Sequence, residues 1–204
     1  MPGPPGPGRV PFIGLTGGIG AGKSTALAAL EELGAATLSA DVVVHELLAT
    51  PEVRSALASR LGEGVLDHDG AVDRAAVAAH VFEHGDDRAW LEGMLWPRVG
   101  ARVAEWRSEV DGREPPPAAA VVEVPLLFEA GMESVFDVTI AVVAEEALRA
   151  ERATARGHTA VVERAGRQLS QGEKARRADH AVRNDGSREE LKAKLSRVLA
   201  TIRT

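Results

Sequence analysis

The chain has 204 residues, of which 45% are hydrophobic, 26% are charged and 3% are aromatic, and its formal net charge is −6. It contains no cysteine, which excludes disulfides, thiolate metal sites and a cysteine nucleophile. No apolar run approaches the roughly 20 residues of a membrane-spanning helix, and the acidic balance argues against a general nucleic-acid binder. These values predict a cytoplasmic globular protein with a disordered, Pro- and Gly-rich tail at residues 1–9.

The first part of the chain shows the pattern of a strand, a helix and a second strand. Residues 10–16 form a short apolar run that leads into a Gly-rich turn, which predicts a buried strand. Residues 22–33 carry leucines at helical spacing, and a strand and a helix are predicted next at 35–38 and 41–48. This order of elements indicates a βαβ unit and a parallel sheet.

The second part of the chain returns to strands after a helical middle. The sequence from Asp41 to Val110 is mainly helical, apart from a polar stretch at 61–74, and prolines at 115–117 end it. The remaining predicted elements are strands at 118–128, 138–144 and 180–182, two helices broken near Gly157 and Gly172, and a C-terminal helix opened by a capping box of Ser187 and Glu190. The continuous apolar strands are typical of a parallel sheet that is covered on both faces.

Residues 17–24, GGIGAGKS, match the phosphate-binding pattern G-x-x-x-x-G-K-[ST]. Small residues allow successive backbone N–H groups to wrap a phosphate, and the N-terminus of the following helix adds partial positive charge. Lys23 is predicted to reach the β- and γ-phosphates, and the Ser24 hydroxyl is predicted to ligate Mg²⁺. The predicted ATP-binding residues of the loop are Gly18, Ile19, Gly20, Ala21, Gly22, Lys23, Ser24 and Thr25. With a strand before it and a helix after it, the motif predicts a nucleoside triphosphate site.

The rest of the sequence favours a small-molecule kinase. There is no guanine-reading N-K-x-D segment, and the D-x-x-G at 67–70 is better explained as an ordinary turn in a polar loop. A small-molecule kinase needs a phosphate cradle, an acceptor site and a lid that excludes water. The segment from Arg149 to Arg183 holds nine Lys or Arg and four Asp or Glu. Arg152 and Arg156, four residues apart, fit such a lid, although a solvated helical face explains the same charges.

Asp41 is the candidate for orienting the acceptor hydroxyl and for taking its proton. It follows the second predicted strand, at the carboxyl edge where parallel sheets bind ligands. A helix N-cap is an equally good interpretation of Asp41. His45 lies one helical turn further on and is a secondary candidate for the same cleft, with a purely structural histidine as the alternative.

Five segments together resemble the dephospho-coenzyme A kinase family over nearly the whole chain. They are IGLTGGIGAGKST at 13–25, LSADVVVHELL at 38–48, DGAVDRAAVAAHVF at 69–82, VPLLFEAGM at 124–132 and RQLSQGEKARRADHAVRNDGS at 167–187. The first segment matches the opening of that family almost residue for residue. The resemblance implies that Asp41 acts on the ribose 3′-hydroxyl of the acceptor, and that Arg74 belongs, with Asp41 and His45, to the acceptor-binding residues.

The resemblance implies transfer of a phosphoryl group from ATP to dephospho-CoA, which gives ADP and CoA in the last step of CoA synthesis. Mg²⁺ would bridge the β- and γ-phosphates, while Arg152 and Arg156 neutralise charge as the lid closes. Asn184, in the turn after the last strand, is assigned to the adenine, with an ordinary turn residue as the alternative. A nucleoside or nucleotide monophosphate kinase stays open, as does a regulatory module that binds nucleotide without transferring it. The expected partner is the small-molecule substrate, with no nucleic acid and no membrane, and the expected state is a monomer or a weak homo-oligomer.

The implied architecture is an α/β fold of the P-loop NTPase type, with three layers around a parallel sheet, a helical substrate domain and a lid. The nucleotide-binding core is predicted at 10–40, 115–148 and 178–204, the helical acceptor domain at 41–114, and the lid at 149–177.

Three positions depart from the family pattern. Ser39 stands where the first Asp of D-A-D is usual, Trp96 stands where the His of His-Pro is usual, and Gly157 replaces the Asp that customarily follows the lid arginine. None of these changes touches the phosphate loop or Asp41. An active enzyme is therefore expected, with its affinity for the acceptor the property most open to change.

Overall fold

The computed structural model describes residues 9–155 and 168–202. They divide into two compact units, each with its own packing. The sheet unit comprises the residues up to Ser39 and those from Arg107 onward, and the helical unit comprises Ala40–Trp106. Most of the predicted tail and the part of the predicted lid at 156–167 lie outside the described residues.

The sheet unit is built on five strands in the order β2-β3-β1-β4-β5. They are β1 (Phe12–Gly17), β2 (Ala36–Ser39), β3 (Ala120–Glu123), β4 (Val138–Val143) and β5 (His180–Arg183). Each neighbouring pair of these strands is parallel, so their carboxyl ends meet at one edge of the sheet. The α/β fold with a parallel sheet that was predicted from the sequence is confirmed.

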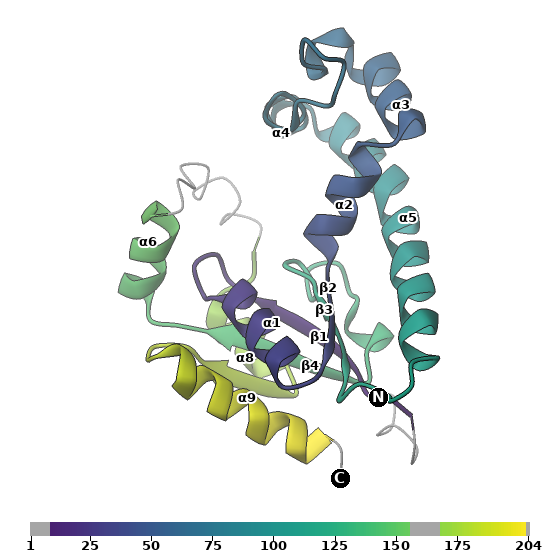
Figure 1. Cartoon of the computed structure of the whole chain (residues 1–204). Helices are drawn as coiled ribbons and strands as arrows, with labels where there is room; N and C mark the ends of the chain where they lie inside the picture. The colour runs from purple at the N-terminus through teal and green to yellow at the C-terminus, as the bar shows by residue number, and fades with distance from the viewer. Residues whose placement is uncertain (1–8, 156–167, 203–204) are drawn as a thin grey trace. The chain divides into compact units, whose positions relative to one another are not determined.

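α1 (Lys23–Glu32) and α9 (Arg188–Ile202) lie side by side on one face of this sheet (Figure 1). Their apolar sides and the inward side chains of the strands form one aliphatic core. Its largest members include Ile13, Leu15, Leu30, Val121, Ile140, Leu191 and Leu195. Because this core fixes α1 against β1, it also fixes the turn that joins them.

The opposite face of β1 carries Gly14 and Thr16, because side chains alternate along a strand. A Cβ at Gly14 would lie 2.6 Å from Leu127 and 2.7 Å from Phe136. Glycine at this position therefore lets these two side chains pack directly on the strand. α8 (Gln171–Arg177) covers the same face and contacts β4 and β1.

The helical unit has a separate core. It packs α2 (Ala40–Leu48), α3 (Pro51–Leu61), α4 (Arg74–Glu83) and most of α5 (Gly85–Asp111) around buried aliphatic side chains. The buried members of this core are Leu48, Val53, Leu57, Val65 and Val77. α3 and α4 are each capped at the N-terminus by a side-chain oxygen, from Thr50 and Asp73 respectively.

The polar stretch between α3 and α4 is a short 3₁₀ helix, Glu63–Val65, followed by a tight turn. In this turn the Asp67 carboxylate accepts hydrogen bonds from the N–H groups of Asp69 and Ala71. The D-x-x-G at this position is therefore an ordinary turn, as expected. Among the described helices, none combines the length and the apolarity that crossing a bilayer requires.

Two predicted boundaries within the sheet unit are wrong. The strand expected to reach residue 128 ends at Glu123, since Pro125 has no N–H to offer the ladder of hydrogen bonds. Gly172 does not break a helix but lies in the first turn of α8, which opens at a capping box formed by Ser170 and Glu173.

The end of the helical unit also differs from the expectation. The unit ends at Trp106 rather than at residue 114, because the last turn of α5 belongs to the sheet unit. In that turn Arg107 is buried, its Nη2 donates to the carbonyl of Val10 at 2.6 Å, and its guanidinium lies over the ring of Phe12. These contacts, rather than the prolines that follow, set the boundary.

Candidate functional site

The phosphate loop follows β1 at the carboxyl edge of the sheet, and α1 begins directly after it at Lys23. Gly20 and Gly22 have φ angles of 75° and 94°, in the left-handed region that favours glycine. A glycine-rich turn ahead of a helix N-terminus presents backbone N–H groups and partial positive charge to an anion. Gly20 and Gly22 therefore allow the sharp turn that such a loop needs, and phosphate binding by it stays a prediction.

The two polar side chains at the start of α1 are placed differently. Lys23 folds back over the loop, where its Nζ donates to the carbonyls of Gly17 at 3.1 Å and Gly18 at 3.2 Å. Ser24 is exposed in the first helical turn. The ammonium group thus lies against the loop, and the hydroxyl is accessible beside it.

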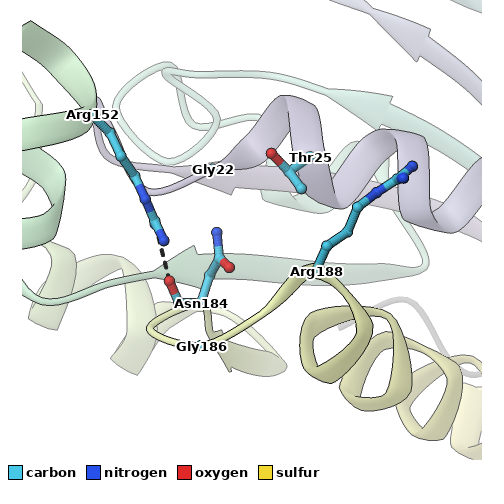
Figure 2. A pocket seen from close by; sticks show the side chains of 6 residues that line it. All are labelled: Gly22, Thr25, Arg152, Asn184, Gly186 and Arg188. Carbon is cyan, nitrogen blue, oxygen red and sulfur yellow. Dashed lines mark hydrogen bonds between the residues drawn. The ribbon is translucent and has the colours of Figure 1, made fainter. Parts of the chain in front are cut away.

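Asn184, which follows β5, is buried against the phosphate loop (Figure 2). Its Nδ2 donates to the Ala21 carbonyl at 2.9 Å, and a Cβ at Gly22 would lie 2.0 Å from that nitrogen. Arg152, on α6 (Glu146–Ala155), donates from Nη1 to the Asn184 carbonyl at 3.0 Å. The side chain assigned to adenine thus contacts the loop itself, and its contact with the base stays a prediction.

A pocket lies beside the loop (Figure 2). It is lined by Gly22, Thr25, Arg152, Asn184, Gly186 and Arg188. Arg188 pairs with Glu32, and a hydrogen bond from Lys192 lowers the pKa of the Glu32 carboxyl, so Glu32 stays ionised opposite these cations. With the guanidinium groups of Arg152 and Arg188 in its lining, the pocket suits an anionic ligand such as a nucleotide.

Glu123 is a buried acid at this edge that the sequence reasoning did not assign to the site. It is the last residue of β3, the strand next to β1, and in register it stands beside Leu15 on one side and Ser39 on the other. By alternation its side chain is on the face of the sheet that α1 covers. The signal available in the sequence is an acid that interrupts an apolar run two residues before Pro125.

The predicted acceptor-binding residues gather at one end of α2 in the helical unit. Asp41 lies inside the first turn of α2, which starts at Ala40, so it does not occupy the N-cap position. His45 is one turn further on, and both side chains are exposed. Nδ1 of His45 lies 3.0 Å from Nη1 of Arg74, so the structure brings these two predicted residues together.

Of the two arginines predicted in the lid, Arg152 lies within the described residues and Arg156 does not. Arg152 contacts the turn at Asn184. The assignment of residues 149–177 to a lid therefore stays a prediction.

A buried ion pair supports the carboxyl edge of the sheet from the face that α8 covers. Lys174 is fully buried, and its Nζ lies 2.9 Å from Oε1 of Glu129. It donates to Oε2 of Glu129 at 3.1 Å, to the Pro125 carbonyl at 2.7 Å and to the Thr16 hydroxyl at 3.5 Å. Glu129 also accepts from the N–H of Leu169 at 2.8 Å. Burial lowers the pKa of Lys174, and the hydrogen bond to Glu129 opposes that shift.

We expect Glu129→Gln to destabilise the protein by about 3–5 kcal/mol, because it leaves the ammonium of Lys174 buried without its counter-charge. The lowered pKa of Lys174 means that the folded protein binds fewer protons than the unfolded chain just below the ordinary lysine pKa. The free energy of unfolding therefore rises with pH in that range. The difference in this free energy between Glu129→Gln and the wild type shrinks there, because the buried Lys174 loses its charge. Urea unfolding at a series of pH values measures both effects.

The surface pair of Glu52 with Arg98 supplies the control, since Glu52→Gln removes an exposed charge and is expected to cost at most about 1 kcal/mol. Combining Lys174→Met with Glu129→Leu is expected to recover most of the lost stability, because no charge then stays buried. A double variant as unstable as Glu129→Gln would contradict this account.

Comparison with known proteins places these features in one family. The family model described as dephospho-CoA kinase matches residues 11–190. A dephospho-CoA kinase of Moorella thermoacetica is 40% identical over 174 residues, covering 84% of this chain and 81% of the relative. One of Deinococcus radiodurans is 38% identical over 201 residues, covering 97% and 95%.

Solved structures show the same fold. A Thermus thermophilus protein superposes with a TM-score of 0.81 at 32% identity, covering 95% of this chain and 98% of the other. A dephospho-CoA kinase of Campylobacter jejuni superposes with a TM-score of 0.68 at 25% identity, covering 93% and 96%. The family model spans the phosphate loop, α2 and its Asp41, the buried pair and the turn at Asn184, and the chain therefore belongs to the dephospho-CoA kinase family, as its motifs predicted.

Proposed function

We propose that this chain transfers the γ-phosphoryl group of ATP to the ribose 3′-hydroxyl of dephospho-CoA, giving ADP and CoA. The observation that carries the proposal is a Gly-rich loop with Gly20 and Gly22 at positive φ, between β1 and α1 at the carboxyl edge of the sheet, within a chain of this family. The acceptor oxygen forms the new bond to phosphorus, the bond from phosphorus to the β-phosphate oxygen breaks, and the hydroxyl proton leaves to a base.

On the ATP side, the loop from Gly18 to Thr25 holds the phosphates through its backbone N–H groups. Lys23 moves from the carbonyls of Gly17 and Gly18 to the β- and γ-phosphates, a short displacement for a flexible side chain that already lies on the loop. The pocket lined by Arg152, Asn184 and Arg188 continues from the loop and receives the rest of the nucleotide.

The residues at this edge fit Mg²⁺, which prefers hard oxygen ligands and keeps several waters. The Ser24 hydroxyl is exposed in the first turn of α1, and the Glu123 carboxylate ends the strand next to β1. We assign Ser24 to direct ligation and Glu123 to the waters around the ion. When bound, the ion neutralises charge on the β- and γ-phosphate oxygens.

On the acceptor side, Asp41 takes the proton of the 3′-hydroxyl, and His45 does not. A guanidinium group has only donors, so the bond from Arg74 requires that Nδ1 of His45 accept. A neutral imidazole with Nδ1 as its acceptor carries its proton on Nε2. While this contact holds, His45 donates to the acceptor substrate and Arg74 fixes its tautomer. Asp41, exposed in the first turn of α2, then supplies the base.

Arg152 and Arg156 neutralise charge around the transferred group as the lid closes. For Arg152 the support is its place in the pocket, with Nη1 4.0 Å from the position of a Cβ at Gly22. For Arg156 the support is the resemblance of the sequence. A cytoplasmic monomer or weak homo-oligomer without nucleic-acid partners remains our expectation for the whole protein.

An acceptor screen tests the proposed function. We expect ADP release from ATP and Mg²⁺ to rise at least about tenfold over water when dephospho-CoA is added. The matched control is CoA, whose 3′-hydroxyl is already phosphorylated and which should leave the release at its basal rate. Stimulation by AMP or a nucleoside instead would assign a monophosphate or nucleoside kinase. Nucleotide binding without stimulated release by any acceptor would assign a regulatory module.

A further inference from the structure

Two carbonyl groups of the phosphate loop accept hydrogen bonds from side chains of distant elements. A loop that turns its N–H groups toward an anion must turn carbonyls away from it, and these need donors. The Ile19 carbonyl accepts from Nε of Arg149 at 2.9 Å, and the Ala21 carbonyl accepts from Nδ2 of Asn184 at 2.9 Å. The donors come from α6 and from the turn after β5.

The contact with Arg149 determines the direction of a loop amide. A trans peptide is planar, with its C=O and N–H pointing in opposite directions. The Ile19 carbonyl and the Gly20 N–H belong to the same peptide, so a carbonyl held toward α6 keeps that N–H pointing away from α6. Gly20 has a φ of 75° and no side chain to restrain it, so this peptide rotates easily unless something holds it.

The loop and the first turns of α6 also fit closely at Arg149. A Cβ at Gly20 would lie 2.3 Å from the Arg149 carbonyl oxygen, and a Cβ at Gly18 would lie 3.0 Å from its Nη2. The guanidinium is oriented in turn by Glu146, whose carboxylate accepts from Nη1 at 2.7 Å. The absence of a side chain at Gly18 and Gly20 therefore leaves room for Arg149 of α6 to pack against the loop.

We propose that Arg149 is a positioning residue for ATP binding: by holding the Ile19 carbonyl it aims the Gly20 N–H at the nucleotide phosphates. Arg149 is 18% exposed and its guanidinium is engaged with the loop backbone and Glu146, so it acts through the loop rather than as a phosphate ligand. The inference rests on the proposed use of ATP and adds a residue that no motif had assigned.

Calorimetric binding of ADP with Mg²⁺ tests the proposal independently of phosphoryl transfer. Arg149→Met keeps the length of the side chain but removes its donors, and we expect it to weaken ADP binding about 10- to 100-fold, the range for a lost hydrogen bond to a charged group. Arg149→Lys keeps the charge but not the planar guanidinium, and we expect a comparable loss. The charge-matched control, Arg197→Met on the exposed side of α9, should bind ADP as the wild type does.

Two further measurements separate positioning from a general effect on the fold. We expect hydrogen exchange of amides 18–22 to accelerate in Arg149→Met, with an unchanged urea midpoint and an unchanged KM for dephospho-CoA. Wild-type ADP affinity in Arg149→Met would overturn the proposal, and so would full affinity in Arg149→Lys, which would make Arg149 a simple charge. A wild type that binds ADP but does not phosphorylate dephospho-CoA would refute the proposed function and leave this inference standing.

Discussion

Replacing Lys23 by alanine is expected to lower phosphoryl transfer by several orders of magnitude while the fold persists. The ammonium group lies on the loop, within 3.2 Å of the carbonyls of Gly17 and Gly18, and is poised to follow charge that develops on the β- and γ-phosphates. The side chain is half-buried, so its loss opens no cavity in the core formed by α1, α9 and the sheet. The measurement is kcat with dephospho-CoA at saturating ATP, beside a circular dichroism spectrum.

Lys192→Ala is the matched control for Lys23→Ala. Lys192 lies on α9 and pairs with Glu32 on the surface, so its replacement removes the same charge at modest cost. We expect near wild-type turnover in the control. Near-normal turnover in a folded Lys23→Ala protein would contradict the phosphate-binding role of the loop.

The phosphate loop could be predicted from the sequence because its chemistry is local. Small residues, a lysine and a hydroxyl must follow one another closely to wrap a phosphate. The residues of the motif at 17–24 therefore largely determine the conformation of the loop by themselves. The same holds for the capping box of Ser187 and Glu190, in which both hydrogen bonds span three residues. Where the interacting groups are neighbours in the chain, spacing alone identified them.

The contacts that hold the loop could not be predicted, because their partners are far apart in the chain. Arg149 contacts a carbonyl 130 residues away, and Asn184 one 163 residues away. In the sequence Arg149 is one cation among nine in a basic segment, and nothing in its neighbourhood distinguishes it. Lys174 looked equally ordinary there, yet it is fully buried against Glu129.

Strand ends are an intermediate case. Glu123 interrupts an apolar run in the sequence, but hydropathy extends the predicted strand to residue 128 and places the acid inside it. Its position at the carboxyl edge follows from where β3 ends and from its register with Leu15 and Ser39. Hydropathy does not show where the hydrogen bonds between neighbouring strands stop. Pro125 does mark that end of β3, because proline has no N–H to donate to the neighbouring strand.

Asp41→Asn is expected to bind both substrates and to lose about 10²- to 10⁴-fold in kcat, the usual range for removal of a general base. The asparagine keeps the size of the side chain and still orients a hydroxyl, but it does not accept the proton at neutral pH. The family motif usually has an aspartate two residues before this position, where the present chain has Ser39. Ser39 has no carboxylate and therefore does not replace Asp41 as the base. The measurement is kcat against dephospho-CoA at saturating ATP.

Two variants on the same helix make this test specific. Glu46→Gln removes an equal charge from an exposed position of α2 and is expected to leave kcat near the wild-type value. His45→Ala is expected to raise KM for dephospho-CoA more than it lowers kcat, because a histidine whose Nδ1 accepts from Arg74 can donate from Nε2 but not take a proton there. An Asp41→Asn protein that keeps most of its activity, beside a His45→Ala protein that has none, would make His45 the base and would require the contact with Arg74 to open during the reaction.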